Sequence, residues 1–140
     1  MLANMHQHIV EELQQSARTD TVFVVTAVIF NLIVLAVNAG VASDAASSRT
    51  NTTANDITLL IFILMTILVN SIAVIALNTG KQTRGKLLNG VLNMYADEGI
   101  DKYYDSSLLM NYNQRYVLFI GVILCLAATA VLVPLVIRFL

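Results

Sequence analysis

Side chains that could bind a metal ion or transfer a proton are few in this chain. His6 and His8 form a His-x-His pair, and imidazole nitrogens are common zinc ligands. No further histidine occurs, and the only cysteine, Cys125, lies inside a long apolar segment. Because a zinc site needs three or four protein ligands, the pair alone does not predict one.

A second group of such side chains is acidic and lies within one short segment: Asp97, Glu98, Asp101 and Asp105. The spacing lacks the alternating acids, the glycine and the terminal glutamate of a calcium-binding EF-hand loop. Acids near the start of a helix are favoured by the helix dipole, which accounts for them without a ligand. No nucleophile, phosphate-binding or dinucleotide-binding motif occurs either. The sequence therefore predicts no catalytic, cofactor-binding or metal-binding residues, and no enzyme.

The more informative polar and small residues lie inside long apolar segments: Asn31, Asn38, Thr66, Asn70, Gly121 and Cys125. An amide that faces lipid leaves its donors and acceptors unpaired, at a cost of several kcal/mol, so these residues should face other helices. One interpretation is helix association, through interhelical hydrogen bonds and close approach at small residues. The other is that Asn31 and Asn38 line an oligomeric pore, which needs several subunits because three helices enclose no channel.

The segments that carry these residues are three uncharged apolar runs, Thr21–Ala42, Ile57–Leu77 and Val117–Ile137. At 1.5 Å per residue, a helix of about 21 residues spans roughly 31 Å, the thickness of a bilayer's hydrocarbon core. The chain is 57% hydrophobic and only 12% charged, about half the charge of a soluble domain. We therefore expect an all-α integral membrane protein with three transmembrane helices. The first run exceeds the length of a signal-peptide core and follows acidic residues, so we interpret it as a retained span.

The remaining segments lie between and outside these spans. Residues 1–20 show apolar residues at helical spacing and predict an N-terminal amphipathic helix, and residues 43–56 are small and polar and predict a solvated loop. Residues 78–116 predict two amphipathic helices that meet at Gly99. This helical hairpin either projects about 25 Å from the membrane or lies flat on its surface.

All five tyrosines of the chain belong to this hairpin: Tyr95, Tyr103, Tyr104, Tyr112 and Tyr116. Tyrosine suits a boundary between apolar and wet surroundings, so we expect these residues either in a belt at the membrane surface or in a seam between helices.

The distribution of basic residues predicts the orientation. Six of the eight Lys and Arg residues fall in residues 1–20 and 78–116, and two fall on the other side, including one in residues 138–140. Since cytoplasmic segments are enriched in basic residues, we expect a multi-pass protein of the cell membrane with a cytoplasmic N-terminus and an outer C-terminus.

Charge and composition also limit the partners. A net charge of −1 and the absence of a basic cluster argue against nucleic acid, and membrane lipid, other copies of the chain or other membrane subunits are the expected partners. The spans contain no ionisable side chain of the kind that proton-coupled transporters hold at membrane depth. The sequence thus predicts a non-enzymatic membrane protein that acts through helix association, as a homo-oligomer or an accessory subunit. The alternative is a homo-oligomeric pore.

Overall fold

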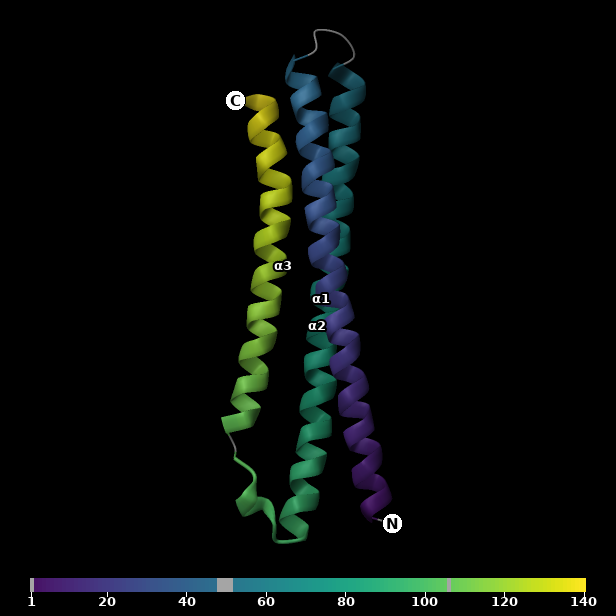
Figure 1. Ribbon diagram of the computed structural model, residues 1–140, viewed down its shortest axis with the longest axis vertical. Helices are drawn as coiled ribbons and strands as arrows, with labels where there is room; N and C mark the ends of the chain where they lie inside the picture. Colours follow the sequence, from purple (N-terminus) through teal and green to yellow (C-terminus); the bar gives the residue numbers. More distant parts are fainter. Residues whose placement is uncertain (1, 48–51, 106) are drawn as a thin grey trace.

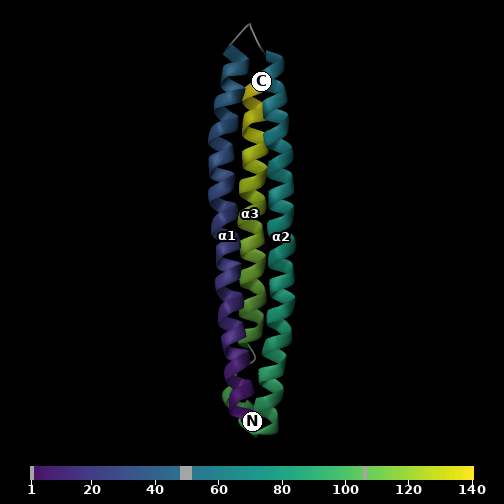
Figure 2. The ribbon, with the colours of Figure 1, turned by 90° about the vertical axis from the view of Figure 1, so that its right-hand side faces the viewer.

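The computed structural model describes residues 2–47, 52–105 and 107–140, and every regular element in these ranges is helical. Helix α1 comprises Leu2–Ser47, α2 comprises Thr52–Asp97, and α3 comprises Ser107–Phe139, with a short 3₁₀ helix, η1, at Asp101–Tyr103. The first two helices form a long antiparallel hairpin, and α3 runs beside them in the direction of α1 (Figure 1). Turned by 90°, the view places α3 between the other two, so the protein is a narrow three-helix bundle (Figure 2).

Each helix is longer than the apolar run that it contains. Helix α1 has 46 residues and passes from the predicted amphipathic segment into the predicted span without a break at Asp20. At 1.5 Å per residue it is about 69 Å long, roughly twice the thickness of a hydrocarbon core. The apolar run Thr21–Ala42 therefore makes up only about half of the length of α1.

The predicted loop over residues 43–56 is mostly helical, which corrects that expectation. Residues 43–47 end α1 and residues 52–56 begin α2, so only residues 48–51 separate the helices, and these lie outside the described residues. The segment contains neither glycine nor proline, and a hydroxyl group in its described part donates to carbonyl oxygens of its own helix. For example, Ser47 Oγ donates to the carbonyl oxygen of Ser43 at 3.0 Å. The run of small polar residues is thus much longer than the connection between the two helices.

Helix α2 ends at the predicted glycine turn. Gly99 has a φ of 69°, the left-handed conformation that glycine adopts most readily. The Gly99 N–H donates to the Ala96 carbonyl and the Ile100 N–H to the Tyr95 carbonyl, the two hydrogen bonds of a Schellman cap.

The helix predicted to follow directly begins later, at Ser107, after η1. Asp105 Oδ1 accepts a hydrogen bond from the Ser107 N–H at 2.8 Å, which satisfies a donor that the first turn of α3 leaves free.

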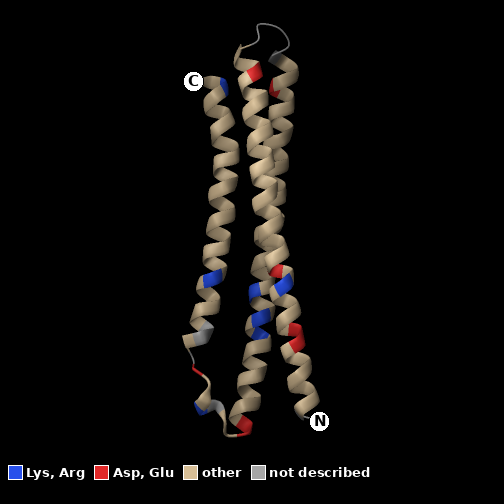
Figure 3. Cartoon of the chain, viewed as in Figure 1, with Lys and Arg blue, Asp and Glu red and all other residues tan. Residues whose placement is uncertain are grey.

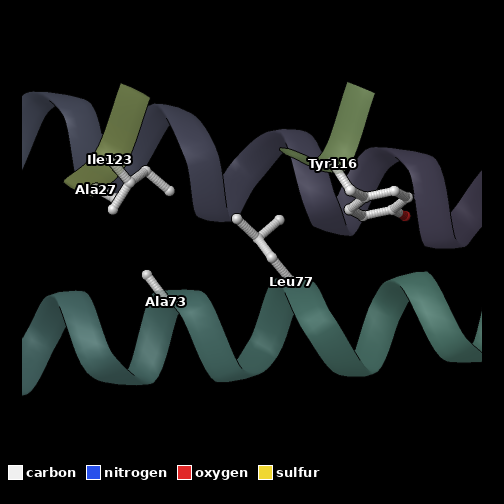
Figure 4. Packing of buried hydrophobic residues seen from close by; sticks show 5 residues of the cluster. All are labelled: Ala27, Ala73, Leu77, Tyr116 and Ile123. Atoms are coloured by element: carbon white, nitrogen blue, oxygen red, sulfur yellow. The ribbon is translucent and has the colours of Figure 1, made fainter. Parts of the chain in front are cut away.

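Buried residues recur every seven positions along the helices, the spacing of coiled-coil packing. In α1 one such series is Asp20, Ala27 and Val34, and a second is Asn31, Asn38 and Ala45. In α2 the series are Leu59, Thr66 and Ala73, and Asn70, Leu77, Arg84 and Val91; in α3 the series is Tyr116, Ile123 and Ala130. Figure 4 shows Ala73 and Leu77 of α2 facing Ala27 of α1 and Ile123 and Tyr116 of α3.

The outer surface of the three apolar segments is hydrophobic. All three helices are long and apolar enough to cross a membrane. Of the most apolar stretch of 18 residues in α1, α2 and α3, only 22%, 22% and 17% is buried within the bundle. Large side chains such as Ile33, Leu64 and Leu118 are more than half exposed. In Figure 3 the charged residues gather in the half of the bundle that holds the N-terminus, and a few lie at the far end, near the C-terminus. Such an apolar surface, too large for a water-soluble monomer, fits a multi-pass membrane protein.

Candidate functional site

The interior of the bundle holds two polar layers, one inside the apolar segments and one at their edge. We call Asn31, Thr66 and Asn70 the amide layer, and Asp20, Arg84 and Tyr116 the charged layer. All six side chains are buried among apolar neighbours, so each layer needs its hydrogen bonds to be satisfied internally.

The amide layer joins α1 to α2 by reciprocal hydrogen bonds. Asn31 Nδ2 donates to Asn70 Oδ1 at 2.8 Å, and Asn70 Nδ2 donates to Asn31 Oδ1 at 2.8 Å. Asn70 Nδ2 also donates to the carbonyl oxygen of Thr66 at 2.7 Å, while the Thr66 hydroxyl donates to the Phe62 carbonyl at 2.7 Å. The pair is therefore almost fully satisfied inside a single chain, which is the arrangement that stabilises helix packing in lipid.

Asn38 behaves differently, although it lies one seven-residue step from Asn31. Its side chain is fully buried, and neither its Nδ2 nor its Oδ1 has a hydrogen-bond partner among the described residues. By the spacing of α1 and α3 it lies at the level of Pro134, which is also fully buried. A proline within a helix leaves the carbonyl four residues earlier without its usual donor. This end of the bundle is thus less well satisfied than the amide layer.

The charged layer connects all three helices at the edge of the apolar segments. The Tyr116 hydroxyl donates to Asp20 Oδ2, and Arg84 Nη2 lies 3.9 Å from the same oxygen. Arg84 Nη2 also donates to the carbonyl oxygen of Leu13 at 3.4 Å, and its guanidinium carbon lies 5.5 Å from the centre of the Tyr112 ring. A buried carboxylate is costly unless it is paired, so this layer fixes the relative positions of the helices.

A glycine makes room for the carboxylate. Any side chain at position 80 would collide with the Asp20 carboxylate, because the position of its Cβ atom overlaps Asp20 Oδ1. Gly80 therefore permits close approach of α1 and α2, despite the cost of glycine within a helix of about 1 kcal/mol.

The five tyrosines do not form one group. Tyr116 belongs to the charged layer and the Tyr112 ring lies beside its Arg84, whereas Tyr95, Tyr103 and Tyr104 lie about the far end of the bundle. There the Tyr95 hydroxyl and His6 Nε2 share a hydrogen bond of 2.9 Å, and the Tyr95 and Tyr104 rings lie 6.2 Å apart.

Burial raises the pKa of Tyr104 above its ordinary value, and the neighbouring Tyr112 and Tyr95 add to the rise. This tyrosine thus stays neutral at physiological pH.

The small residues of α3 face away from the interior. Gly121 and Cys125 are exposed on the side of the helix opposite Ile123, and no atom lies within 4 Å of the position that a Cβ of Gly121 would occupy. The structure thus separates the residues that the sequence grouped together. The amide-bearing residues and Thr66 are internal, whereas Gly121 and Cys125 form an outer face.

A salt bridge closes the end of the bundle opposite the N-terminus. Arg138 Nε and Nη2 donate to the two carboxylate oxygens of Asp56 at 2.7 and 3.1 Å, which ties the end of α3 to the start of α2.

Sequence reasoning missed Asp20 and Arg84. The seven-residue spacing of buried positions could have identified both residues. Arg84 continues the series of Asn70 and Leu77, and Asp20 begins that of Ala27 and Val34.

Comparisons with protein-family models, with curated proteins and with solved structures find no match to this chain. Within the described ranges, no three His, Cys, Asp or Glu side chains lie close enough together to hold a metal ion.

Proposed function

We propose that this chain is a non-enzymatic membrane protein that works through helix association, as a homo-oligomer or as an accessory subunit of a larger membrane complex. The observation that carries the proposal is the outer face of α3, formed by Gly121, Cys125 and Ala128 and exposed at all three positions. Small residues at intervals of four and three on a membrane helix let a second helix approach closely, and van der Waals packing then replaces contact with lipid.

The burial of the asparagines supports the same proposal, because it leaves them unavailable to line a pore. Asn31 and Asn38 are 1% and 0% exposed, so neither can line a channel between subunits unless the bundle opens. The amide layer stabilises the fold of the single chain, so association with another chain must use the outer surface of the bundle. We therefore place helix association ahead of an asparagine-lined pore.

We further propose that the amphipathic halves of α1 and α2 project from the cytoplasmic surface as a coiled coil. Helix α2 continues unbroken past Leu77, and α1 still contacts it near the N-terminus through the bond between His6 and Tyr95. A helix lying flat on the bilayer would need a bend at the end of the span. The excess of Lys and Arg in this half favours the cytoplasmic side.

Cysteine cross-linking in membranes tests the association. Cys125 is the only cysteine and is exposed on the proposed face, so oxidation or a short bismaleimide should give covalent dimers of the wild-type protein. Replacing Gly121→Leu should weaken association at least fivefold, because the added side chain prevents close approach.

Gly40→Leu is the matched control. Gly40 is an exposed glycine within the apolar run of α1, and it too has no atom within 4 Å of its Cβ position. A wild-type protein that associates neither with a second copy nor with another subunit in native membranes, or equal effects of the two substitutions, would contradict the proposed face.

A further inference from the structure

We propose that the seam between α2 and α3 binds a phospholipid with an anionic headgroup, its phosphate beside Lys81 and Arg84 and one acyl chain in an apolar groove beyond them. The pocket and the groove share only Ala128 with the association face proposed above, and neither Gly121 nor Cys125 lines them. Substitutions at Lys81 and Gly85 therefore test lipid binding without changing that face.

The headgroup part is a small basic pocket at the edge of the apolar segments. It has a volume of about 220 Å³ and lies between Lys81, Arg84 and Asn89 of α2 and Tyr112 and Asn113 of α3. Among the described residues that line it, two are basic, two are asparagines and none is acidic. Cationic and amide donors around a water-accessible hollow suit a phosphate group.

The charges of this pocket are only partly neutralised by the protein. Arg84 Nη2 lies 3.9 Å from the Asp20 carboxylate, which partly neutralises its charge. Among the described residues, no carboxylate lies within 4 Å of the Lys81 ammonium. Gly85 lines the same pocket, and a Cβ at that position would meet no atom within 4 Å. The glycine thus leaves open a space that a larger side chain would fill.

The acyl-chain part is a groove of about 610 Å³ farther along the same two helices. Its walls include Val74 and Ile75 of α2 and Leu124, Ala127 and Val131 of α3, and its lining is mainly apolar. The groove lies within the apolar segments, where lipid chains are the surrounding medium.

Helical spacing places the pocket and the groove on one continuous seam. Lys81 follows Val74 by seven residues and Leu124 follows Asn113 by eleven, and both separations return a helix to nearly the same face. The rise from Ile75 to Lys81 is about 9 Å. A phosphate held at Lys81 therefore has its acyl chains directed along the groove. This alignment of a basic pocket with an apolar groove matches a phospholipid better than a free anion.

Native mass spectrometry of the full chain in a mild detergent tests the proposal with three probes: dioleoylphosphatidylglycerol, dioleoylphosphatidylcholine and inorganic phosphate. We expect one phosphatidylglycerol molecule to bind at least fivefold more tightly than phosphatidylcholine, and inorganic phosphate to bind far more weakly than either. Equal affinity for the two lipids would overturn the charge argument. Phosphate binding as tight as the lipid's would overturn the role of the groove.

Variants locate the site. Lys81→Gln should weaken phosphatidylglycerol about fivefold, the factor that corresponds to about 1 kcal/mol for one basic residue near the membrane surface. Lys86→Gln is the matched control, since Lys86 is exposed on the same helix but lines neither hollow.

Two further substitutions leave every charge in place. Gly85→Leu should abolish binding by filling the pocket, and Ala127→Phe should weaken lipid binding by occupying the groove. Equal losses for Lys81→Gln and Lys86→Gln, or full binding by Gly85→Leu, would overturn the proposal. Circular dichroism of each variant separates loss of binding from loss of fold.

Discussion

Truncating Asn31 to alanine should destabilise the protein much more than truncating Asn38, although both are buried asparagines of the same helix. Asn31 exchanges two hydrogen bonds of 2.8 Å with Asn70, whereas the amide of Asn38 has no partner among the described residues. Both substitutions remove the same atoms and both sites are fully buried, so the cost of the cavity largely cancels when the two are compared.

The magnitude follows from the hydrogen bonds. Interhelical hydrogen bonds in membrane proteins contribute about 0.6 kcal/mol each on average, so losing two costs about 1.2 kcal/mol. Asn31→Ala also leaves Asn70 Oδ1 buried without a donor, at about 1–3 kcal/mol. Asn38→Ala breaks no such bond and removes two unsatisfied buried atoms, which favours the folded state. Asn31→Ala should therefore destabilise the bundle more than Asn38→Ala by at least about 2 kcal/mol.

Reversible unfolding in mixed micelles, followed by circular dichroism, measures both free energies of unfolding. The double variant Asn31→Ala/Asn70→Ala completes a thermodynamic cycle, and its coupling energy should be about 1–2 kcal/mol. If Asn38→Ala costs as much as Asn31→Ala, or the cycle is additive to within about 0.3 kcal/mol, the amide layer does not stabilise the fold as argued.

Two further predictions concern the glycine at the charged layer and the start of α3. Gly80→Ala should destabilise the protein, because the added Cβ displaces the Asp20 carboxylate from its partners. Gly85→Ala should stabilise it by up to about 1 kcal/mol, because no atom lies near the added Cβ. Chemical denaturation compares the two free energies of unfolding, and a stabilised Gly80→Ala would show that the carboxylate moves freely. The hydrogen bond from the Ser107 N–H lowers the pKa of Asp105 below its ordinary value of 3.8, so its contribution to stability is complete above that pH and is lost as the pH falls through the lowered pKa. Protection from hydrogen exchange at the start of α3, measured relative to the intrinsic exchange rate at each pH, should therefore fall below about pH 4 in the wild type but not in Asp105→Asn, which still accepts the hydrogen bond without titrating. The same loss of protection in both would exclude this cap as the cause.

Much of the architecture followed from the sequence because hydropathy is a local property. The three apolar runs each lie within a helix that is long and apolar enough to cross a membrane. Asn31, Asn70 and Thr66, which the sequence argument directs towards other helices, are buried inside the bundle. Gly121 and Cys125 lie on the outer surface of the bundle, so a facing helix there would have to come from another chain.

Helix boundaries were less predictable. Residues 43–56 are polar but contain no helix breaker, and the continued packing of α1 on α2 overrides their weak preference for a loop. Gly80, Gly85 and Gly90 have a low helix propensity, yet α2 is unbroken to Asp97. Tertiary contacts there outweigh a propensity cost of about 1 kcal/mol for each glycine.

The sequence by itself determined that the protein has three helices whose apolar surfaces require lipid around them. It also determined a glycine turn and an excess of basic residues on one side. Only the tertiary structure decided which polar groups meet. Asn31 pairs with a residue 39 positions away, and Asp20 with one 96 positions away. Those pairings depend on the axial offset and rotation of whole helices, which result from the fit of many side chains at once. No local pattern in the chain encodes them.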